Sequence, residues 1–595
     1  HIPMDGTDAV IDYIGGNGTS TLIFRFTITG GYASSDLNYI DTTALALNGG
    51  SIMDAAGNSA NLILPHPDST GSLGQEKNLV VDGGPPLVIS VSSTAIDSSY
   101  IIGDTLAITV LFSESVAVTG TPKLTLETGS TDAVVYYSTG SGTSILSFEY
   151  TVTLNHMASD LNYIDTASLV LNGGTIRDIA QNNANLTLPD PDSTGSLGVN
   201  KSLVIDGIIP IVNEVTSAVP DGIYKLGDTL AITIPFSEEI IVIGTPQITL
   251  ETGNNDAVVY YSSGSGTSIL TFQYVVAAGD NTSDLDYAGV IALGLNSGSI
   301  KDTAGNNAIL TLPDPGNSSS LGYNKALVID GIVPTIYSVT STVTDSVFKI
   351  DDEIPIIVTL SEPVFVDTSG GKPQIMLETG STDAIANYVG GGGSSTLIFN
   401  YIVASGNSSN DLDYTSDSAL TLNGGTIMDA AGSSAHLTLA APGIAGSLAA
   451  NKTLYIDGIL PVVTSISSNA LDTTYIIADT IGIAVTLNEA VTVTGTPQLT
   501  METGNTDTAI NYITGTGTNV LTFNYIVADG HSSANLDYIS TSALTLNNGT
   551  ITDEVGNPAS LILPTPGSVG SLSYNKTIAL DADPPTVIQM ISTSA

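Results

Sequence analysis

The sequence predicts an all-β protein built from tandem sandwich domains, and three observations lead to this prediction. First, one pattern of residues recurs about every 124 positions along the 595-residue chain. Second, apolar and polar residues alternate over short segments of each repeat, which is typical of strands that bury one face. Third, Gly, Asn, Asp, Pro and Ser separate these segments, and no segment sustains the 3.6-residue period of an amphipathic helix.

The repeat length follows from a lysine that stands five residues before an aspartate, first as Lys77 and Asp82. The aspartates of this pair recur at intervals of 124, 124, 127 and 124 residues, as Asp82, Asp206, Asp330, Asp457 and Asp581. The three extra residues fall around 367–373, where a hairpin loop absorbs an insertion at little cost in free energy. Such a period suits one independent β-domain and is too long for a helical solenoid unit.

These repeats predict the domain boundaries. We expect a partial repeat without its opening strands, four complete repeats and the opening strand of a following repeat, over residues 1–82, 83–206, 207–330, 331–457, 458–581 and 582–595. Two explanations of the partial first repeat stay open. The sequence is a window on a longer array, or a strand from a neighbouring chain completes the first domain by strand addition.

The second repeat shows the expected strands in chain order. Residues 87–93 form a short apolar run after two prolines, residues 105–112, 123–127 and 145–152 alternate, and residues 133–138 are β-branched and aromatic. Three short segments follow at residues 168–171, 185–188 and 202–205. Seven or eight strands in a repeat of this length predict two sheets packed face to face.

The composition limits the possible functions. The chain has 12 Lys plus Arg against 58 Asp plus Glu, and its formal net charge is -46. Such a surface repels nucleic acid phosphates and anionic lipid, and it attracts cations. The chain has no cysteine, so no disulfide stabilises a domain. No stretch approaches the roughly 20 apolar residues of a membrane span. We therefore expect neither nucleic acid binding nor membrane insertion.

Several short motifs of the repeat together carry a resemblance to a known family. In the second repeat they are Phe-Ser-Glu-Ser-Val at 112–116, Gly-Thr-Pro at 120–122, Leu-Glu-Thr-Gly at 126–129, Asp-Leu-Asn-Tyr at 160–163, and Asp178 followed by Asn182. The pattern resembles the bacterial Ig-like tandem repeats of giant cell-surface and adhesin-type proteins, over essentially the whole chain. The resemblance implies immunoglobulin-like β-sandwich domains arranged end to end as an extended rod. It also implies secretion and, often, bound calcium.

Three acidic positions recur and are predicted to meet at each domain boundary. They are the junction aspartate, a glutamate that follows the second strand, and an aspartate in a later turn. If consecutive strands run back and forth, all three reach the same end of the domain, where their charges repel unless a cation intervenes. Because Ca²⁺ prefers six to eight oxygen ligands, we predict one calcium ion per boundary, held by Asp82, Glu114 and Asp178; Asp206, Glu238 and Asp302; Asp330, Glu362 and Asp429; and Asp457, Glu489 and Asp553.

A simpler role for some of these acids stays open. Asp and Asn cap turns by accepting hydrogen bonds from their own backbone, and Asp178 in its turn fits that role equally well. The opposite end of the domain carries Asp104, Glu127, Asp132 and Asp160. These four acids are candidates for a second ion, although turn capping is the preferred interpretation of Asp132 and Asp160.

The sequence predicts no enzyme. The five histidines, His1, His66, His156, His436 and His531, are interpreted as surface or loop residues that do not recur as a site. The predicted function is a calcium-stiffened stalk, fibre or filament, extracellular or at a cell surface, with neighbouring repeats or other chains as partners. The main alternative is an adhesin whose repeats bind a glycan or another surface. An accessory region of an enzyme and an ice- or crystal-binding array are further alternatives.

Overall fold

The computed structural model of the protein describes residues 2, 8–583 and 585–591. Strands form nearly all of its regular structure, which confirms the predicted all-β class. The helices among the described residues are single turns of four residues, and none is long and apolar enough to cross a membrane. The chain forms two compact units, one of His1–Asp221, Thr229–Tyr274 and Asp284–Ala326, the other of Gly222–Asp228, Val275–Ser283 and Leu327–Ala595.

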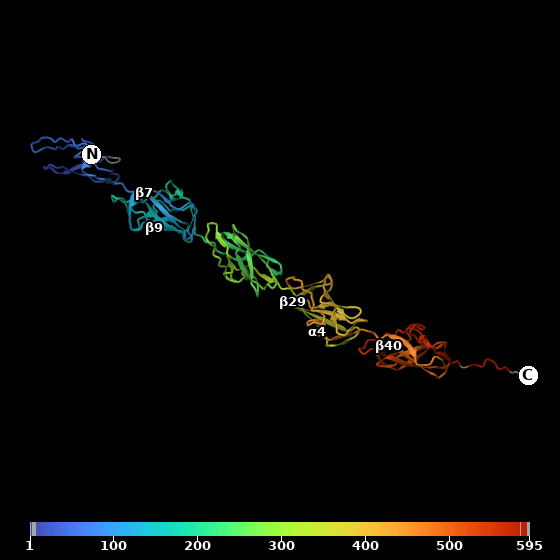
Figure 1. The fold of residues 1–595 in the computed structure, drawn as a ribbon. Coiled ribbons are helices and arrows are strands. Elements are labelled where there is room, and N and C mark those ends of the chain that lie inside the picture. The colour runs from blue at the N-terminus through green and yellow to red at the C-terminus, as the bar shows by residue number, and fades with distance from the viewer. Residues whose placement is uncertain (1, 3–7, 584, 592–595) are drawn as a thin grey trace. The chain divides into compact units, whose positions relative to one another are not determined.

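The repeat 83–206 contains an eight-stranded and a three-stranded sheet. Figure 1 labels two strands of the larger sheet, β7 and β9. The larger sheet has the order β12-β8-β9-β10-β7-β14, with β5 beside β7 and β13 beside β8, and the smaller one has the order β11-β15-β6. The elements are β5 (Val88–Ser93), β6 (Ser98–Ile101), β7 (Thr105–Thr119), β8 (Lys123–Glu127), β9 (Ala133–Thr139), β10 (Thr143–Thr151), β11 (Met157–Ala158), β12 (Asn162–Tyr163), β13 (Leu169–Val170), β14 (Thr175–Arg177), α2 (Leu197–Asn200) and β15 (Leu203–Asp206).

One core holds the two sheets of this repeat together. Ile108 and Val110 of β7 lie in the same buried cluster as Leu203 and Ile205 of β15. These residues follow the alternation seen in the sequence, because every second side chain of a strand points to the same face. The two sheets therefore pack face to face, as a β-sandwich requires.

The strand predictions for this repeat are correct in most places and wrong in one. Residues 185–188 form no strand, because Asn185 makes only an isolated parallel bridge to Leu87, and the next residue after Leu188 is a proline. The predicted second strand is longer than expected, since β7 continues through Glu114 to Thr119. The sequence also did not predict β6, which pairs in parallel with β15.

Residues 207–330 contain the equivalent elements, with the sheet orders β16-β18-β21-β20-β19-β23 and β17-β26-β22. Two further strands extend the first sheet, β24 along β19 and β25 along β18. The elements are β16 (Thr216–Ser217), β17 (Gly222–Lys225), β18 (Thr229–Ile243), β19 (Gln247–Glu251), β20 (Ala257–Ser263), β21 (Thr267–Val275), β22 (Asn281–Thr282), β23 (Asp286–Tyr287), β24 (Leu293–Gly294), β25 (Ser299–Asp302), α3 (Leu321–Asn324) and β26 (Leu327–Asp330).

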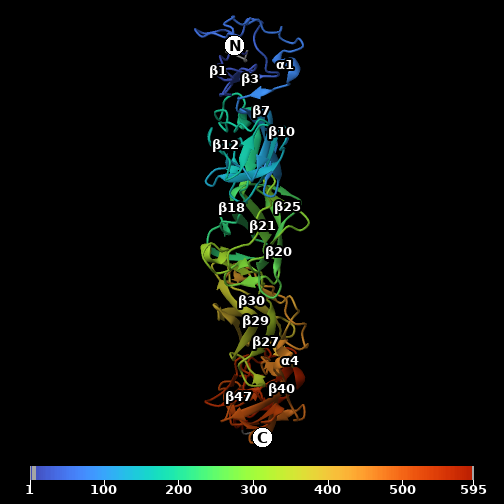
Figure 2. The same ribbon diagram turned by 90° about the vertical axis from the view of Figure 1, so that its left-hand side faces the viewer.

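Residues 331–457 repeat the same topology. Figure 2 labels β27, β29, β30 and α4 of this repeat. The three extra residues lie in the connection between β29 and β30, but these strands do not pair with each other, so the predicted hairpin loop is wrong. The elements are β27 (Ile336–Ser341), β28 (Ser346–Phe348), β29 (Glu353–Asp367), β30 (Gln374–Glu378), β31 (Ala384–Gly390), β32 (Ser394–Ile402), β33 (Ser408–Ser409), β34 (Asp413–Tyr414), β35 (Leu420–Thr421), β36 (Thr426–Met428), α4 (Leu448–Asn451) and β37 (Leu454–Asp457).

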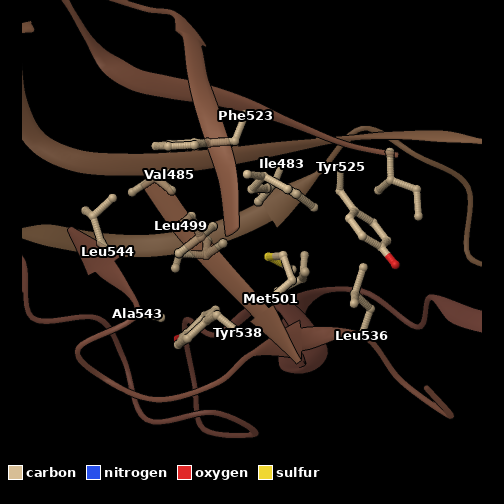
Figure 3. Close-up of a cluster of buried hydrophobic side chains, with 14 of the residues drawn as sticks. Ile483, Val485, Leu499, Met501, Phe523, Tyr525, Leu536, Tyr538, Ala543 and Leu544 are labelled. Atoms are coloured by element: carbon tan, nitrogen blue, oxygen red, sulfur yellow. The ribbon is translucent and has the colours of Figure 1, made fainter. Parts of the chain in front are cut away.

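Residues 458–581 form the same two sheets around a core that Figure 3 shows. The ring of Phe523 is fully buried there and makes an edge contact with Tyr512 at a centroid distance of 6.1 Å. The elements are β38 (Val463–Ser468), β39 (Thr474–Tyr475), β40 (Thr480–Thr494), β41 (Gln498–Glu502), β42 (Thr508–Thr514), β43 (Thr518–Ile526), β44 (Ser532–Ser533), β45 (Asp537–Tyr538), β46 (Leu544–Thr545), β47 (Thr550–Thr552), α5 (Leu572–Asn575) and β48 (Ala579–Asp581).

The first segment, residues 1–82, has a smaller core of Ile2, Ala9, Leu37 and Val81. Its elements are β1 (Asp12–Gly15), β2 (Ile23–Arg25), β3 (Ala33–Ser34), α1 (Leu73–Glu76) and β4 (Val81–Asp82). The predicted opening strand at 582–595 falls partly on residues 584 and 592–595, which lie outside the described residues. Residues 585–591 form no regular element, and the six domain boundaries stay predictions.

Candidate metal centre

Three elements of the fold place the three recurrent acids. In the first case, Asp82 ends β4, Glu114 lies inside β7, and Asp178 directly follows β14. The pairing of Arg177 with Ala117 sets Asp178 opposite Val116, two residues from Glu114 on the same strand face. The prediction that Glu114 follows the second strand is wrong, because β7 continues past this residue to pair with β14.

The structure brings the acids together at three of the four predicted positions. One carboxylate oxygen from each residue lies within 4.8 Å of the others in the sets Asp82, Glu114 and Asp178; Asp206, Glu238 and Asp302; and Asp330, Glu362 and Asp429. We call them the Asp82, Asp206 and Asp330 clusters. In each cluster the junction aspartate and the glutamate are half-buried, and the turn aspartate is buried.

The turn aspartate also caps its own turn, so the two roles that the sequence left open coexist. Asp302 Oδ1 accepts hydrogen bonds from the backbone N–H groups of Gly305 and Asn306, at 2.6 and 2.8 Å. Its Oδ2 accepts one from Asn306 Nδ2 at 2.8 Å. An ionised carboxylate offers about four acceptor positions, so these three hydrogen bonds leave capacity for a cation.

Burial and the neighbouring aspartates raise the pKa of the glutamate in each cluster. Burial is the largest cause for Glu114, Glu238 and Glu362, and the two aspartates of the same cluster add to it. Among the described residues, the lysine ion pairs are made with Asp97, Asp221, Asp345 and Asp472 and not with a cluster acid. The negative charge of each cluster is therefore not balanced by a basic side chain.

The raised pKa of these glutamates predicts how the effect of calcium depends on pH. A pKa that is higher in the folded state contributes stability that is present below the ordinary value of 4.5 and is lost as the pH rises through the raised value. Protons and calcium then compete for the same oxygens. The gain in melting temperature on adding calcium is expected to grow from about pH 4 to about pH 7. A gain that is constant over this range would contradict the prediction.

Two of the clusters contain buried carboxylate oxygens that have no hydrogen-bond partner and that a bound cation would satisfy. Glu238 Oε1 and Glu362 Oε1 are buried without a hydrogen-bond partner. At the Asp330 cluster, Asp429 is 5 % exposed, and its Oδ2 has no partner either. Ser433 stands there in place of the turn asparagine, and its short side chain leaves its own Oγ unpartnered. Such groups are costly to bury alone, and a cation within reach would satisfy the carboxylates.

The fourth predicted set, Asp457, Glu489 and Asp553, is not among the clusters that the structure forms within its described residues. Its strand carries Asn488 where the other repeats have serine. The Oδ1 atom of Asn488 accepts from Val462 N–H, as the serine Oγ does elsewhere, and its Nδ2 donates to Glu489 Oε1 at 3.3 Å. The amide thus offers the glutamate a neutral partner, although burial, Asp457 and Asp553 still raise the pKa of Glu489.

Three of the acids at the other end of the repeat accept hydrogen bonds from backbone N–H groups. Asp104 Oδ2 accepts from Ile101 N–H, Glu127 Oε1 from Gly129 N–H, and Asp160 Oδ1 from Leu203 N–H. Within the described residues, these acids and Asp132 form no cluster of three with metal-ligand spacing. The backbone N–H that Asp160 binds lies 43 residues away and not in its own turn, so turn capping by Asp132 and Asp160 and the second ion both stay predictions.

Two of the histidines that were predicted to be unrelated surface or loop residues share one structural position. His156 and His531 are separated by three repeat intervals and occupy equivalent positions. Each ring stacks on a buried tyrosine, Tyr150 or Tyr525, at a centroid distance of 5.7 Å. Burial lowers the pKa of His156. The recurrence was visible in the sequence, but Asp280 and Asn407 fill the position in the other two repeats and obscure it.

The ligand chemistry of the clusters fits a hard cation. Carboxylate oxygens form the donor set, with the junction carbonyl nearby, whereas zinc sites use nitrogen and sulfur. Calcium accepts irregular geometry and completes its shell with water, while magnesium demands near-ideal octahedral ligands. Three carboxylates from three separate segments therefore suit calcium better than magnesium.

Comparisons with known proteins give likenesses of low identity. No family model matches the chain, and no curated protein matches it. Among solved structures, the I-band fragment I67-I69 from titin is 12% identical, covers 63% of this chain and 99% of its own, and has a TM-score of 0.24. The plexin A4 extracellular region, domains 1 to 10, is 10% identical over 85% of this chain and 39% of its own, with a TM-score of 0.13. Likenesses with TM-scores this low support no inference about this chain.

Proposed function

We propose that this protein is a structural tandem-repeat protein whose repeat junctions bind calcium, and that it serves as an extracellular or cell-surface stalk or fibre. The observation that carries the proposal is the threefold recurrence of one carboxylate cluster. In each cluster the terminal strand of one repeat supplies an aspartate, and the next repeat supplies the glutamate and the turn aspartate. A cation bound to all three ties two consecutive repeats through their shared junction.

The junctions are short, which makes such a bridge effective. Only Gly207, Ile208, Ile209 and Pro210 separate the end of β15 from the first bridged residue of the next repeat, Ile211. Proline restricts its own φ and biases the preceding residue toward extended geometry. Ile208 N–H donates to Asp206 Oδ1 at 3.1 Å, so the junction folds back on its own aspartate. A cation on that aspartate would restrict the junction further.

The acidic composition agrees with an extracellular role. Extracellular calcium modules bind their ion with dissociation constants of about 10⁻⁴–10⁻³ M, which millimolar calcium fills. A charge of -46 keeps such a chain soluble and favours cations over phosphates and anionic lipid. Other copies of the chain are proposed partners in a fibre.

A calcium titration of the full chain tests this function. Calcium that binds only the folded state at 10 to 100 times its dissociation constant adds about 1.4–2.7 kcal/mol per site. For repeats of this size we expect a rise in melting temperature of roughly 5–10 °C. Chelator is expected to reverse the rise, and equal magnesium to give a smaller one. An unchanged melting temperature in millimolar calcium would end the proposal.

A further inference from the structure

We propose that the side-chain amide of Asn306 couples calcium binding at the Asp206 cluster to the docking of the preceding repeat, and that Ser433 breaks this coupling in the repeat 331–457. Asn306 is a positioning residue in this proposal and not a metal ligand. The inference rests on the proposed calcium function, and it adds that the junctions of one chain respond differently to the ion.

The amide of Asn306 joins three separate segments. Its Nδ2 donates to Asp302 Oδ2 at 2.8 Å and to the backbone carbonyl of Asp206 at 3.0 Å. Its Oδ1 accepts from the N–H of Ile102, which belongs to the preceding repeat, at 3.2 Å. Because two acceptors face the nitrogen, the oxygen must face the donor. Asn306 is 4 % exposed, so water offers these groups little replacement.

Through the Asn306 amide, the contact between the two repeats depends on the position of the Asp302 carboxylate. Without a cation, Asp302 faces two like charges within 4.8 Å, and Glu238 Oε1 is buried without a partner. Repulsion of this kind favours displacement of a carboxylate, which disturbs the oxygen that anchors the amide. A bound cation holds Asp302 in place. The amide then stays oriented, and its Oδ1 stays available to Ile102.

Two other junctions between repeats distinguish the role of the amide from that of the carboxylate cluster, because each has only one of them. In the repeat 458–581, Asn557 makes the same three hydrogen bonds, to Asp553 Oδ2, the Asp457 carbonyl and Ile350 N–H, at 2.8, 2.7 and 2.9 Å. However, Asp457, Glu489 and Asp553 are not among the clusters with metal-ligand spacing that the described residues form. This contact has the amide without the compact metal site.

The repeat 331–457 shows the opposite combination. It has the Asp330 cluster, but Ser433 is too short to bridge, and both Ser433 Oγ and Asp429 Oδ2 lack partners. The preceding repeat reaches this turn through Lys225, whose Nζ donates to the Gly432 carbonyl at 2.9 Å. That hydrogen bond does not pass through a cluster acid. Calcium is therefore expected to bind here without ordering the contact.

The experiment measures order across single junctions in the full chain. The protein has no cysteine, so two introduced cysteines carry spin labels without background. Ser138→Cys with Ser262→Cys spans the junction with Asn306, and Ser262→Cys with Val389→Cys spans the junction with Ser433. These exposed residues occupy equivalent strand positions. Calcium is expected to narrow the distance distribution of the first pair strongly and that of the second pair less, because only the first junction adds the amide to the cation bridge.

Two reciprocal variants decide the role of the amide. In Asn306→Ser the calcium-induced narrowing of the 138–262 distribution is expected to fall to that of the wild-type 262–389 pair, while calorimetry still detects calcium at the Asp206 cluster. In Ser433→Asn the calcium-induced narrowing of the 262–389 distribution is expected to increase. This second variant introduces the amide and so remains informative if Asn306→Ser folds poorly. Undiminished narrowing in Asn306→Ser, or no increase in Ser433→Asn, overturns the coupling.

The same measurements separate this inference from the proposed function. If the wild-type chain binds no calcium in calorimetry, the proposed function fails, and the coupling fails with it. If the wild-type chain binds calcium and both label pairs respond alike, calcium binding at the clusters stands and only the coupling is overturned.

Discussion

The variant Glu238→Gln is expected to bind one calcium ion fewer than the wild type and to lose the corresponding stabilisation of about 1.4–2.7 kcal/mol in saturating calcium. Glutamine has nearly the same shape as glutamate, so the half-buried position inside β18 stays filled. The change removes one of three carboxylates that lie within 4.8 Å of one another. Calorimetric stoichiometry and melting temperature measure the two effects.

In chelator the sign of the effect is expected to reverse. Without a cation, the pKa of Glu238 is raised by burial and by Asp302 and Asp206, so its ionised form destabilises the fold at neutral pH. The neutral amide removes that repulsion, and Glu238→Gln should then melt above the wild type. Glu239→Gln is the matched control, because the next residue of the strand points to the other face and is exposed. A variant that melts lower in both conditions would show a structural role only.

The second large effect is expected in the core of the repeat 458–581. Phe523→Ala removes a fully buried ring (Figure 3) and leaves a cavity among neighbours such as Ile483 and Val485. Truncations of this kind cost about 3–5 kcal/mol, because the surroundings relax only partly. Hydrogen exchange resolved by peptide should show faster exchange throughout residues 458–581.

The exchange pattern also tests whether the repeats unfold separately. The buried cluster of this repeat shares no residue with that of the repeat 83–206, so peptides from residues 83–206 should exchange as in the wild type. Tyr574→Ala is the control, since that side chain is 59% exposed in the single-turn helix α5 and surface substitutions cost about 0.5 kcal/mol or less. Fast exchange that spreads to residues 83–206 would contradict separate cores.

The candidate site was only partly predictable from the sequence. The recurrence of Asp206, Glu238 and Asp302 followed from the repeat interval, because equivalent positions fold alike. Their mutual distance depended on β18 changing partners from β21 to β25, which local alternation does not reveal. At the fourth junction, Asn488 Nδ2 donates to Glu489 Oε1 at 3.3 Å, a contact that only the folded geometry reveals. Sequence recurrence alone therefore overstated the similarity of the junctions.

The repeat, the all-β class and the buried faces of the long strands were predictable from the sequence, since a period of two is a local property of the backbone. Strand direction also predicted that the three carboxylates meet, but only the packed structure shows the parallel pairing of β6 with β15, the absence of a strand at residues 185–188, and which of the predicted sets have metal-ligand spacing. These features join residues about 30 to 105 positions apart. Such contacts depend on how whole strands pack, and no pattern within one strand records them.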